Sequence, residues 1–199
     1  MKKTLPLLFV LAALLAPQGA AAGTPNPLTA QIAPFSSQPL DAYGYDWARK
    51  CTGHAQVGTL DLQAWLAANV PGVSWGIYNC RKVRTGSTLS LHAEGRAVDW
   101  HLDVRKSADR VVANRLIGAF LAPDAAGNPG ALARRMGLQE IIWNCRVWST
   151  NYPNAGMRPY SVCRRKVSAT LAHKDHLHIG LNWPGARAQT SFWRPPVSR

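Results

Sequence analysis

Residues 97–104 read Ala-Val-Asp-Trp-His-Leu-Asp-Val, and this stretch decides the fold because apolar and polar side chains alternate along it. Alternation with a period of two indicates a half-buried β-strand, whose successive side chains point to opposite faces of a sheet. The apolar face carries Val98, Trp100, Leu102 and Val104, and the other face carries Ala97, Asp99, His101 and Asp103. One polar face of this strand therefore presents three potential metal ligands.

The segments around this strand predict further helices and strands. Three segments have helical patterns: 61–70, which Pro71-Gly72 ends, 108–121, which Pro123 ends, and the short segment 132–136. Three more have strand patterns: 73–78, with Val73, Trp75 and Ile77 on its half-buried side, 140–143 and 176–181. The remaining segments, 81–86 and 149–162, are expected to be loops. Because helices and strands do not alternate regularly, we expect an α+β fold with a mostly antiparallel sheet flanked by helices.

The N-terminal end has the layout of an export signal. Lys2 and Lys3 precede an apolar run at 5–16, and small residues follow up to Ala22. This layout predicts a secretory signal peptide at 1–22. The run is shorter than the roughly 20 residues that a membrane span needs, and no later segment qualifies as a span. Residues 23–40 contain four prolines and predict a flexible leader, and residues 41–199 are expected to form a single domain.

The chain is strongly basic, with a formal charge of +13 that falls to +11 without Lys2 and Lys3. An exported protein with this charge is attracted to polyanions such as anionic cell-wall polymers, acidic lipids or nucleic acid, and charge alone does not choose among them. We expect a secreted, periplasmic or cell-wall-associated protein.

Cys51, Cys80, Cys145 and Cys163 are the four cysteines. An even number of cysteines in an exported protein indicates disulfide bonds. Three pairings are possible, and the nearest-neighbour pairing, Cys51–Cys80 with Cys145–Cys163, is favoured because each bond closes a modest loop. A zinc–thiolate site is not expected, since the chain has no Cys-x-x-Cys pair.

Two segments carry the residue types of a metal site: 90–99, which contains His92 and Asp99, and 173–178, which contains the His-x-His pair His176 and His178. Zinc binds imidazole nitrogen and carboxylate oxygen, and a catalytic site offers three protein ligands. A turn at Gly95 can fold His92 and Asp99 onto one metal ion. The His-x-His pair supplies a third ligand, because its two histidines share one face of a strand.

A metal-activated water also needs a neighbouring group to take its proton. Asp175 is the best candidate for this base, and Glu94 is the competing one. In strict strand alternation Asp175 points away from His178, so its role requires that it lie in the loop before the strand begins.

Ser-x-His (90–92), Gly-x-Ala-x-Asp (95–99) and Asp-His-x-His (175–178) together resemble the LAS metallopeptidases. These are the D-alanyl-D-alanine carboxypeptidases and L-alanyl-D-glutamate endopeptidases that cut peptidoglycan stem peptides. The resemblance covers roughly residues 75–182 and implies an LAS/hedgehog-like zinc peptidase fold with Zn²⁺ as cofactor. Tyr-x-Cys-Arg (78–81) before the first motif also resembles the bacterial extensin-like branch.

The resemblance also implies a role for each matching residue. The family's ligands fall on His92, Asp99 and His178, and its acidic base falls on Asp175. Asp in place of Glu at the base position is similar to the endopeptidase branch. Arg81 matches the arginine that binds substrate or the developing oxyanion, with Arg84 as a rival, and His176 is expected to hydrogen-bond substrate or transition state.

The remaining chemistry-bearing residues have plainer interpretations. Ser90 is expected either to orient the first motif, beside bound substrate, or to serve only the turn. His54 is expected at the surface, and His101 and Asp103 are expected around the metal site or exposed rather than on the ion. Trp143 and Trp183 are candidates for lining a cleft.

These features predict an exported, monomeric zinc peptidase that hydrolyses an amide bond in peptidoglycan stem peptides or cross-links. The first alternative is a non-catalytic, zinc-containing wall-binding module, which an Asp175 pointing away from the metal would favour. The second is a basic nucleic-acid-binding protein or nuclease. It is less expected, and no nucleic acid partner is predicted, because no acidic cluster supplies the oxygen ligands of a hard cation.

Overall fold

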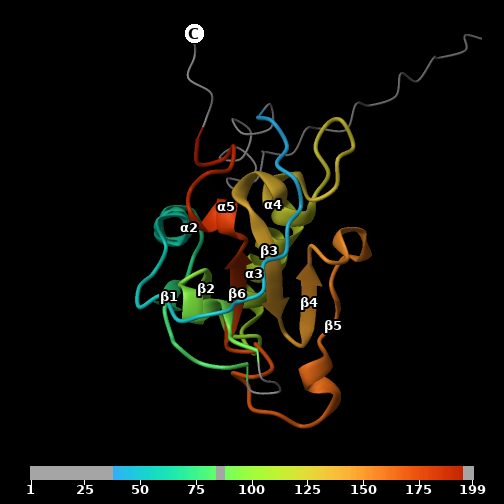
Figure 1. Ribbon diagram of the computed structural model, residues 1–199. Coiled ribbons are helices and arrows are strands. Elements are labelled where there is room, and N and C mark those ends of the chain that lie inside the picture. The colour runs from blue at the N-terminus through green and yellow to red at the C-terminus, as the bar shows by residue number, and fades with distance from the viewer. Residues whose placement is uncertain (1–37, 84–87, 195–199) are drawn as a thin grey trace, which may run out of the picture.

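The protein has an α+β fold built on one antiparallel sheet of six strands (Figure 1). The computed structural model describes residues 38–83 and 88–194. The sheet order is β1-β2-β6-β3-β4-β5, and every neighbouring pair is antiparallel. The strands are β1 (Val73–Gly76), β2 (Ala97–His101), β3 (Leu138–Trp143), β4 (Arg146–Ser149), β5 (Arg158–Pro159) and β6 (His176–Leu181). The strand predicted at 97–104 is confirmed over 97–101, and it pairs with β6, which lies far along the chain.

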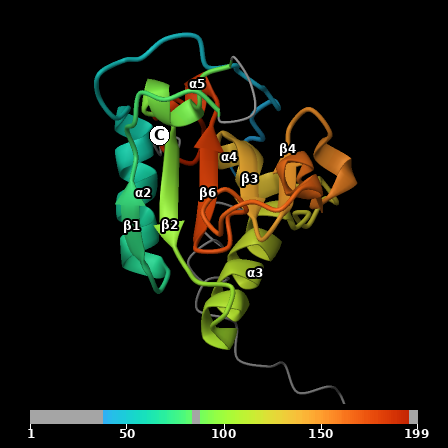
Figure 2. The same cartoon turned by 90° about the horizontal axis from the view of Figure 1, so that it is seen from below.

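The described helices are α2 (Val57–Asn69), α3 (Ser107–Leu121), α4 (Ala131–Met136) and α5 (Trp183–Ala186). Helix α2 lies beside β1 and β2, and α4 lies beside β3 (Figures 1 and 2). Short 3-10 turns occur at Leu91–Glu94, Pro153–Ala155 and Ser161–Arg164. No helix among the described residues has the length and apolar content that a membrane crossing requires.

The two faces of the sheet differ in chemistry. One face carries the apolar side chains of the central strands, among them Trp100, Leu177 and Ile179, all at most 1% exposed. Apolar side chains from α2, α3 and α4 join the same cluster, for example Leu66 and Phe120. Each such side chain contributes about 1.5–3 kcal/mol when fully buried. The other face carries the polar side chains, which are Asp99, His101, Glu140, His176 and His178. These polar side chains therefore project from strands whose opposite face is packed in the core.

Of the three residues predicted on the half-buried side of 73–78, only Ile77, which follows β1, is buried, at 7% exposed. Val73 is 58% exposed and Trp75 is 51% exposed. Strand β1 is an edge strand in which Val73 pairs with His101 of the polar face, and a bulge follows between Ser74 and Gly76. The ring of Trp75 stacks on that of His101, with ring centroids 4.2 Å apart.

The structure has two strands that the sequence pattern does not predict: β4, which ends where the expected loop at 149–162 begins, and β5 within that loop. Strand β4 forms a hairpin with β3 through a turn at Asn144 and Cys145, both of which have a positive φ. Within 149–162 the structure adds β5, two residues long. The helices predicted at 61–70, 108–121 and 132–136 and the strand at 176–181 are confirmed, although α2 begins four residues earlier at Val57.

Both nearest-neighbour disulfides are present, Cys51–Cys80 and Cys145–Cys163, as is consistent with a secreted protein. They join residues 29 and 18 positions apart. In the chain-entropy account, loops of this size give about 3–4 kcal/mol of stabilisation each. The predicted signal peptide at 1–22 and most of the leader at 23–40 lie outside the described residues.

Candidate metal centre

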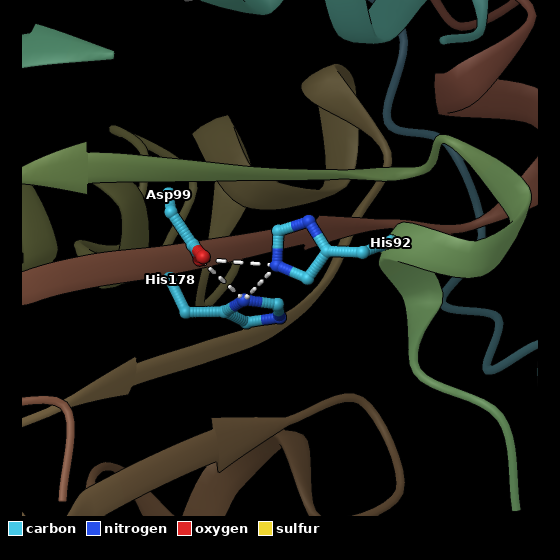
Figure 3. Close-up of side chains that lie close together, drawn as sticks. All are labelled: His92, Asp99 and His178. Carbon is cyan, nitrogen blue, oxygen red and sulfur yellow. Dashed lines mark hydrogen bonds and ion pairs between the residues drawn. The ribbon is translucent and has the colours of Figure 1, made fainter. Parts of the chain in front are cut away.

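Asp99 and His178 are direct partners across the β2–β6 pair, so their side chains project from the same face of the sheet. Oδ1 of Asp99 lies 3.0 Å from Nδ1 of His178 (Figure 3). The neighbouring cross-strand pair is His101 and His176. The strand register therefore brings together two residues that are 79 positions apart in the chain.

His92 reaches the same point from the 3-10 turn that precedes β2. Oγ of Ser90 accepts a hydrogen bond from the backbone N–H of His92 at the start of the turn. Gly95 ends the turn with a φ of 64°, and a side chain there would collide with the backbone of His54. Gly95 thus meets the requirement of this turn for a residue without a side chain, and Ser90 caps its start.

The ring of His92 is held in one tautomer. Its Nδ1–H donates to the carbonyl oxygen of Ile77 at 2.6 Å. A carbonyl can only accept, so Nδ1 carries a proton, and Nε2, which faces the centre, is the ring atom that a metal ion would bind. Nε2 lies 3.1 Å from Oδ1 of Asp99 and 3.1 Å from Nδ1 of His178 (Figure 3). A backbone acceptor behind a histidine is the usual arrangement for a metal ligand.

These three residues form a group that could hold a metal ion, with one ligand atom from each residue within 4.8 Å of the others. Burial opposes the charge on Asp99, but hydrogen bonds with His178 and His92 outweigh it and hold its pKa well below the usual range. Burial would lower the pKa of His178, yet the contacts with Asp99 and Glu140 raise it to about 9. The centre thus combines a permanent negative charge with two imidazoles, a donor set suited to a divalent cation.

Glu140 stands behind His178 and was not singled out from the sequence. It lies on β3, and its Oε1 is 3.5 Å from Nε2 of His178, a ring atom that makes no hydrogen bond within the described residues. The hydroxyl of Tyr45 donates to Oε2 of Glu140 at 3.0 Å. A carboxylate beyond a ligand histidine orients the ring and makes it a stronger donor. Only the pairing of β3 with β6, which local sequence does not reveal, brings Glu140 here.

Asp175 lies immediately before β6, as its predicted role requires, but it contacts neither His92 nor Asp99 nor His178 through any described bond. Its Oδ1 accepts from Nδ1 of His176 at 2.8 Å, and its Oδ2 accepts from the hydroxyl of Thr170 at 2.7 Å. Nε2 of His176 in turn lies 3.6 Å from Oδ1 of Asp99. Asp175 therefore reaches the metal centre through the ring of His176. Burial lowers the pKa of this ring and so favours its neutral form.

The competing base, Glu94, has another function. It is 2% exposed, and its carboxylate binds the guanidinium of Arg96, which is fully buried, at 2.7 Å. Its second oxygen accepts the backbone N–H of Arg49. These contacts anchor the N-terminal segment against the turn, and they leave both carboxylate oxygens of Glu94 engaged.

A cavity of about 530 Å³ opens on one side of the centre. Its lining includes His178, Glu140, Ser90 and Arg81, so Arg81 shares this cavity with one residue of the candidate metal group. Its rival, Arg84, lies outside the described residues. Trp143 and Trp183 do not line this cavity.

His173 also lines the cavity and was not predicted as a site residue. Its ring centroid lies 4.7 Å from that of His176 and 5.6 Å from that of His178. Burial and the two neighbouring histidines lower its pKa to about 2, so it is neutral. His173 has a φ of 50°, so the chain turns at this residue, and its ring lies near the two histidines of β6. The local sequence gives little indication of this turn.

The remaining predicted residues lie near the centre or outside it. His101 is half-buried, and its Nδ1–H donates to the backbone oxygen of Asp175. Asp103 forms an ion pair with Arg105. His54 is exposed, as expected.

Fold and site together define an α+β protein with a buried His–Asp–His group that could hold a metal ion beside a cavity. The family model described as VldE, C-terminal domain, matches residues 51–173, more than half of the chain. The chain therefore belongs to this family. The matched region contains His92 and Asp99 and ends before His178. None of the curated proteins and none of the solved structures matches the chain.

Proposed function

We propose that the protein is an exported, zinc-dependent peptidase that hydrolyses an amide bond in peptidoglycan stem peptides or cross-links. The observation that carries the proposal is the convergence of His92, Asp99 and His178 at the edge of a cavity lined by Arg81. Two imidazole nitrogens and one carboxylate oxygen are a ligand set of catalytic zinc, which keeps a further position open. The likeness of the motifs to the LAS peptidases supports the choice of substrate.

Zn²⁺ held by these three residues supplies Lewis acidity for the attacked carbonyl and lowers the pKa of water. The chain's own acid–base group is the Asp175–His176 pair. Because Nδ1–H of His176 is donated to Asp175, Nε2 is left as a proton acceptor facing the centre. Both oxygens of Asp175 are already hydrogen-bonded, which favours His176 as the group that meets the substrate.

In the reaction, the oxygen of water adds to the amide carbon and Nε2 of His176 takes the proton. His176 then gives this proton to the amide nitrogen as the C–N bond breaks, and Asp175 stabilises the intervening imidazolium. The guanidinium of Arg81 binds the substrate from the cavity wall. The positive charge of the chain favours residence in an anionic cell wall, and we propose that the protein acts there as a monomer.

One observation favours a second candidate, a zinc-containing wall-binding module without turnover. Asp175 does not contact the ligand group directly, as an acidic base of the expected kind would. A nuclease gains no comparable support, because Glu140 is the one acidic side chain that lines the described part of the cavity.

Incubation with purified peptidoglycan tests the proposal, with fragments identified by mass. The zinc-loaded protein is compared with protein treated with a chelator and with the Asp99→Ala variant. We expect new peptide ends only in the first sample. Unchanged muropeptides in the presence of a stoichiometric amount of bound zinc would overturn the peptidase proposal.

A further inference from the structure

The floor of the cavity is a row of residues that crosses four strands in register. His178 on β6 pairs with Ile142 on β3, which pairs with Val147 on β4, which pairs with Arg158 on β5. All four residues line the cavity. Three strand spacings separate His178 from Arg158, a distance of about 14 Å. An extended peptide of about four residues has this length. The cavity therefore runs from the metal centre to Arg158.

The guanidinium of Arg158 is fixed in position but not saturated. It lies over the ring of Tyr152, 4.2 Å from the centroid, and Nη2 is at 3.5 Å from Oγ of Ser149. Its Nε is buried and has no hydrogen-bond partner among the described residues. In the described ranges, no carboxylate forms an ion pair with it. A buried N–H without a hydrogen-bond partner costs free energy. A ligand that accepts a hydrogen bond from the guanidinium of Arg158 would reduce this cost.

The surroundings of Arg158 favour a negatively charged ligand. Arg81 and Arg164 line the same cavity, and the acidic side chain among its described lining residues, Glu140, lies at the far end beside His178. The Cys145–Cys163 disulfide and the hydrogen bond from Tyr160 N–H to the carbonyl of Cys145 hold this wall to β4. A planar guanidinium that is held in place but has no carboxylate partner among the described residues suits a carboxylate of a ligand, which it can bind through two parallel hydrogen bonds.

We propose that Arg158 binds a carboxylate of the substrate, several residues away from the bond that is cleaved at the metal centre. The inference rests on the proposed peptidase function and specifies its substrate: an extended acidic peptide, not a neutral one and not a dipeptide. Stacking on Tyr152 restricts the guanidinium before the ligand arrives, which reduces the ordering cost of binding.

Two zinc-loaded steady-state assays test the proposal, one with a stem peptide that has a free glutamyl carboxylate and one with the same peptide amidated at that position. We expect the wild-type protein to prefer the acidic peptide. Arg158→Ala should raise KM for this peptide about 10- to 100-fold, the loss of a charge-assisted hydrogen bond, with little change in kcat. The amidated peptide should be affected much less. Arg158→Lys keeps the charge but loses the planar pair of donors. Its KM for the acidic peptide should lie between those of the wild type and Arg158→Ala.

Arg187→Ala is the matched control, because Arg187 also stacks on an aromatic ring, that of Trp183, but does not line the cavity. It removes the same charge and should leave both KM values unchanged. Equal cleavage of the acidic and amidated peptides by the wild type would overturn the role of Arg158 even if no Arg158 variant folds. So would equal effects of the Arg158 and Arg187 variants. If the wild type cleaves neither peptide nor peptidoglycan, the proposed function itself fails.

Discussion

At the scale of single residues, both histidines of the candidate metal centre are oriented by a second group. Ile77 fixes the tautomer of His92 through its carbonyl oxygen, and Glu140 stands behind His178. Asp99 bridges the two histidines at 3.0 and 3.1 Å. Such outer contacts determine how well three side chains can bind one ion, since an unsupported ring loses entropy on binding.

Glu140→Gln removes the negative charge behind His178 and keeps the size of the side chain. We expect zinc affinity to fall about 10- to 100-fold, as for other partners of ligand histidines. Competition with a fluorescent chelator measures this change. Tyr45→Phe, which removes only the hydrogen bond to Glu140, should have a smaller effect in the same direction. If zinc affinity is the same in Glu140→Gln as in the wild type, Glu140 does not support the metal ligand.

Asp175→Asn tests the acid–base pair. The amide can donate to Nδ1 of His176, which moves the ring proton to Nε2 and removes the acceptor that faces the centre. We expect zinc content to be unchanged and kcat to fall about 10²- to 10⁴-fold, with an altered pH–rate profile. Thr170→Val, which removes the other bond of Asp175, is the control and should retain most activity. Full activity of Asp175→Asn would exclude the pair from catalysis.

At the scale of elements, the sequence predicted those segments whose periodicity the core preserves. Strand β2 and helix α3 each bury one face, so their patterns survive in the structure. The edge strand β1 has no such constraint, because a bulge and the exposed Trp75 break its alternation. In the same way, His92 and Asp99 are close in sequence and were recognised, while Glu140 depends on strand pairing over long range.

The contact between α2 and α5 depends on Gly58. A Cβ at this position would collide with the backbone oxygen of Gly185, and no rotamer change relieves a backbone clash. Gly58→Ala should therefore cost about 1–3 kcal/mol of unfolding free energy, despite the higher helix propensity of alanine. Gly118→Ala in α3 is the matched control, since a Cβ there meets nothing within 4 Å, and it should stabilise by about 0.5–1 kcal/mol. Urea denaturation measures the unfolding free energy of both variants. The explanation holds only if Gly58→Ala lowers this free energy and Gly118→Ala raises it.

At the scale of the whole molecule, the polar centre is attached to a sheet whose other face is the apolar core. Metal binding would therefore be coupled to folding, because the candidate ligands come from the turn before β2, from β2 and from β6 and meet only in the folded chain. An ion that binds only the native state stabilises it by mass action. The two disulfides stabilise the same native state independently of the metal.

The coupling has a definite dependence on pH. In the metal-free protein the pKa of His178 is raised from 6.5 to about 9. Its stabilising contribution is therefore fully present below pH 6.5 and is lost as the pH rises towards 9. Zinc requires the neutral ring and must displace this proton, so its affinity should rise with pH by up to tenfold per unit over the same range.

Thermal unfolding with and without zinc, between pH 6 and pH 8, measures this dependence. The increase in Tm on adding zinc should grow with pH, because the metal-free protein loses stability while the zinc complex gains affinity. Calorimetric titration in two buffers of different ionisation enthalpy should show release of about one proton per zinc at pH 7. A zinc-induced shift in Tm that is constant across this range would mean that His178 is not protonated in the metal-free protein. The contacts of His178 with Asp99 and Glu140 would then not raise its pKa as described above.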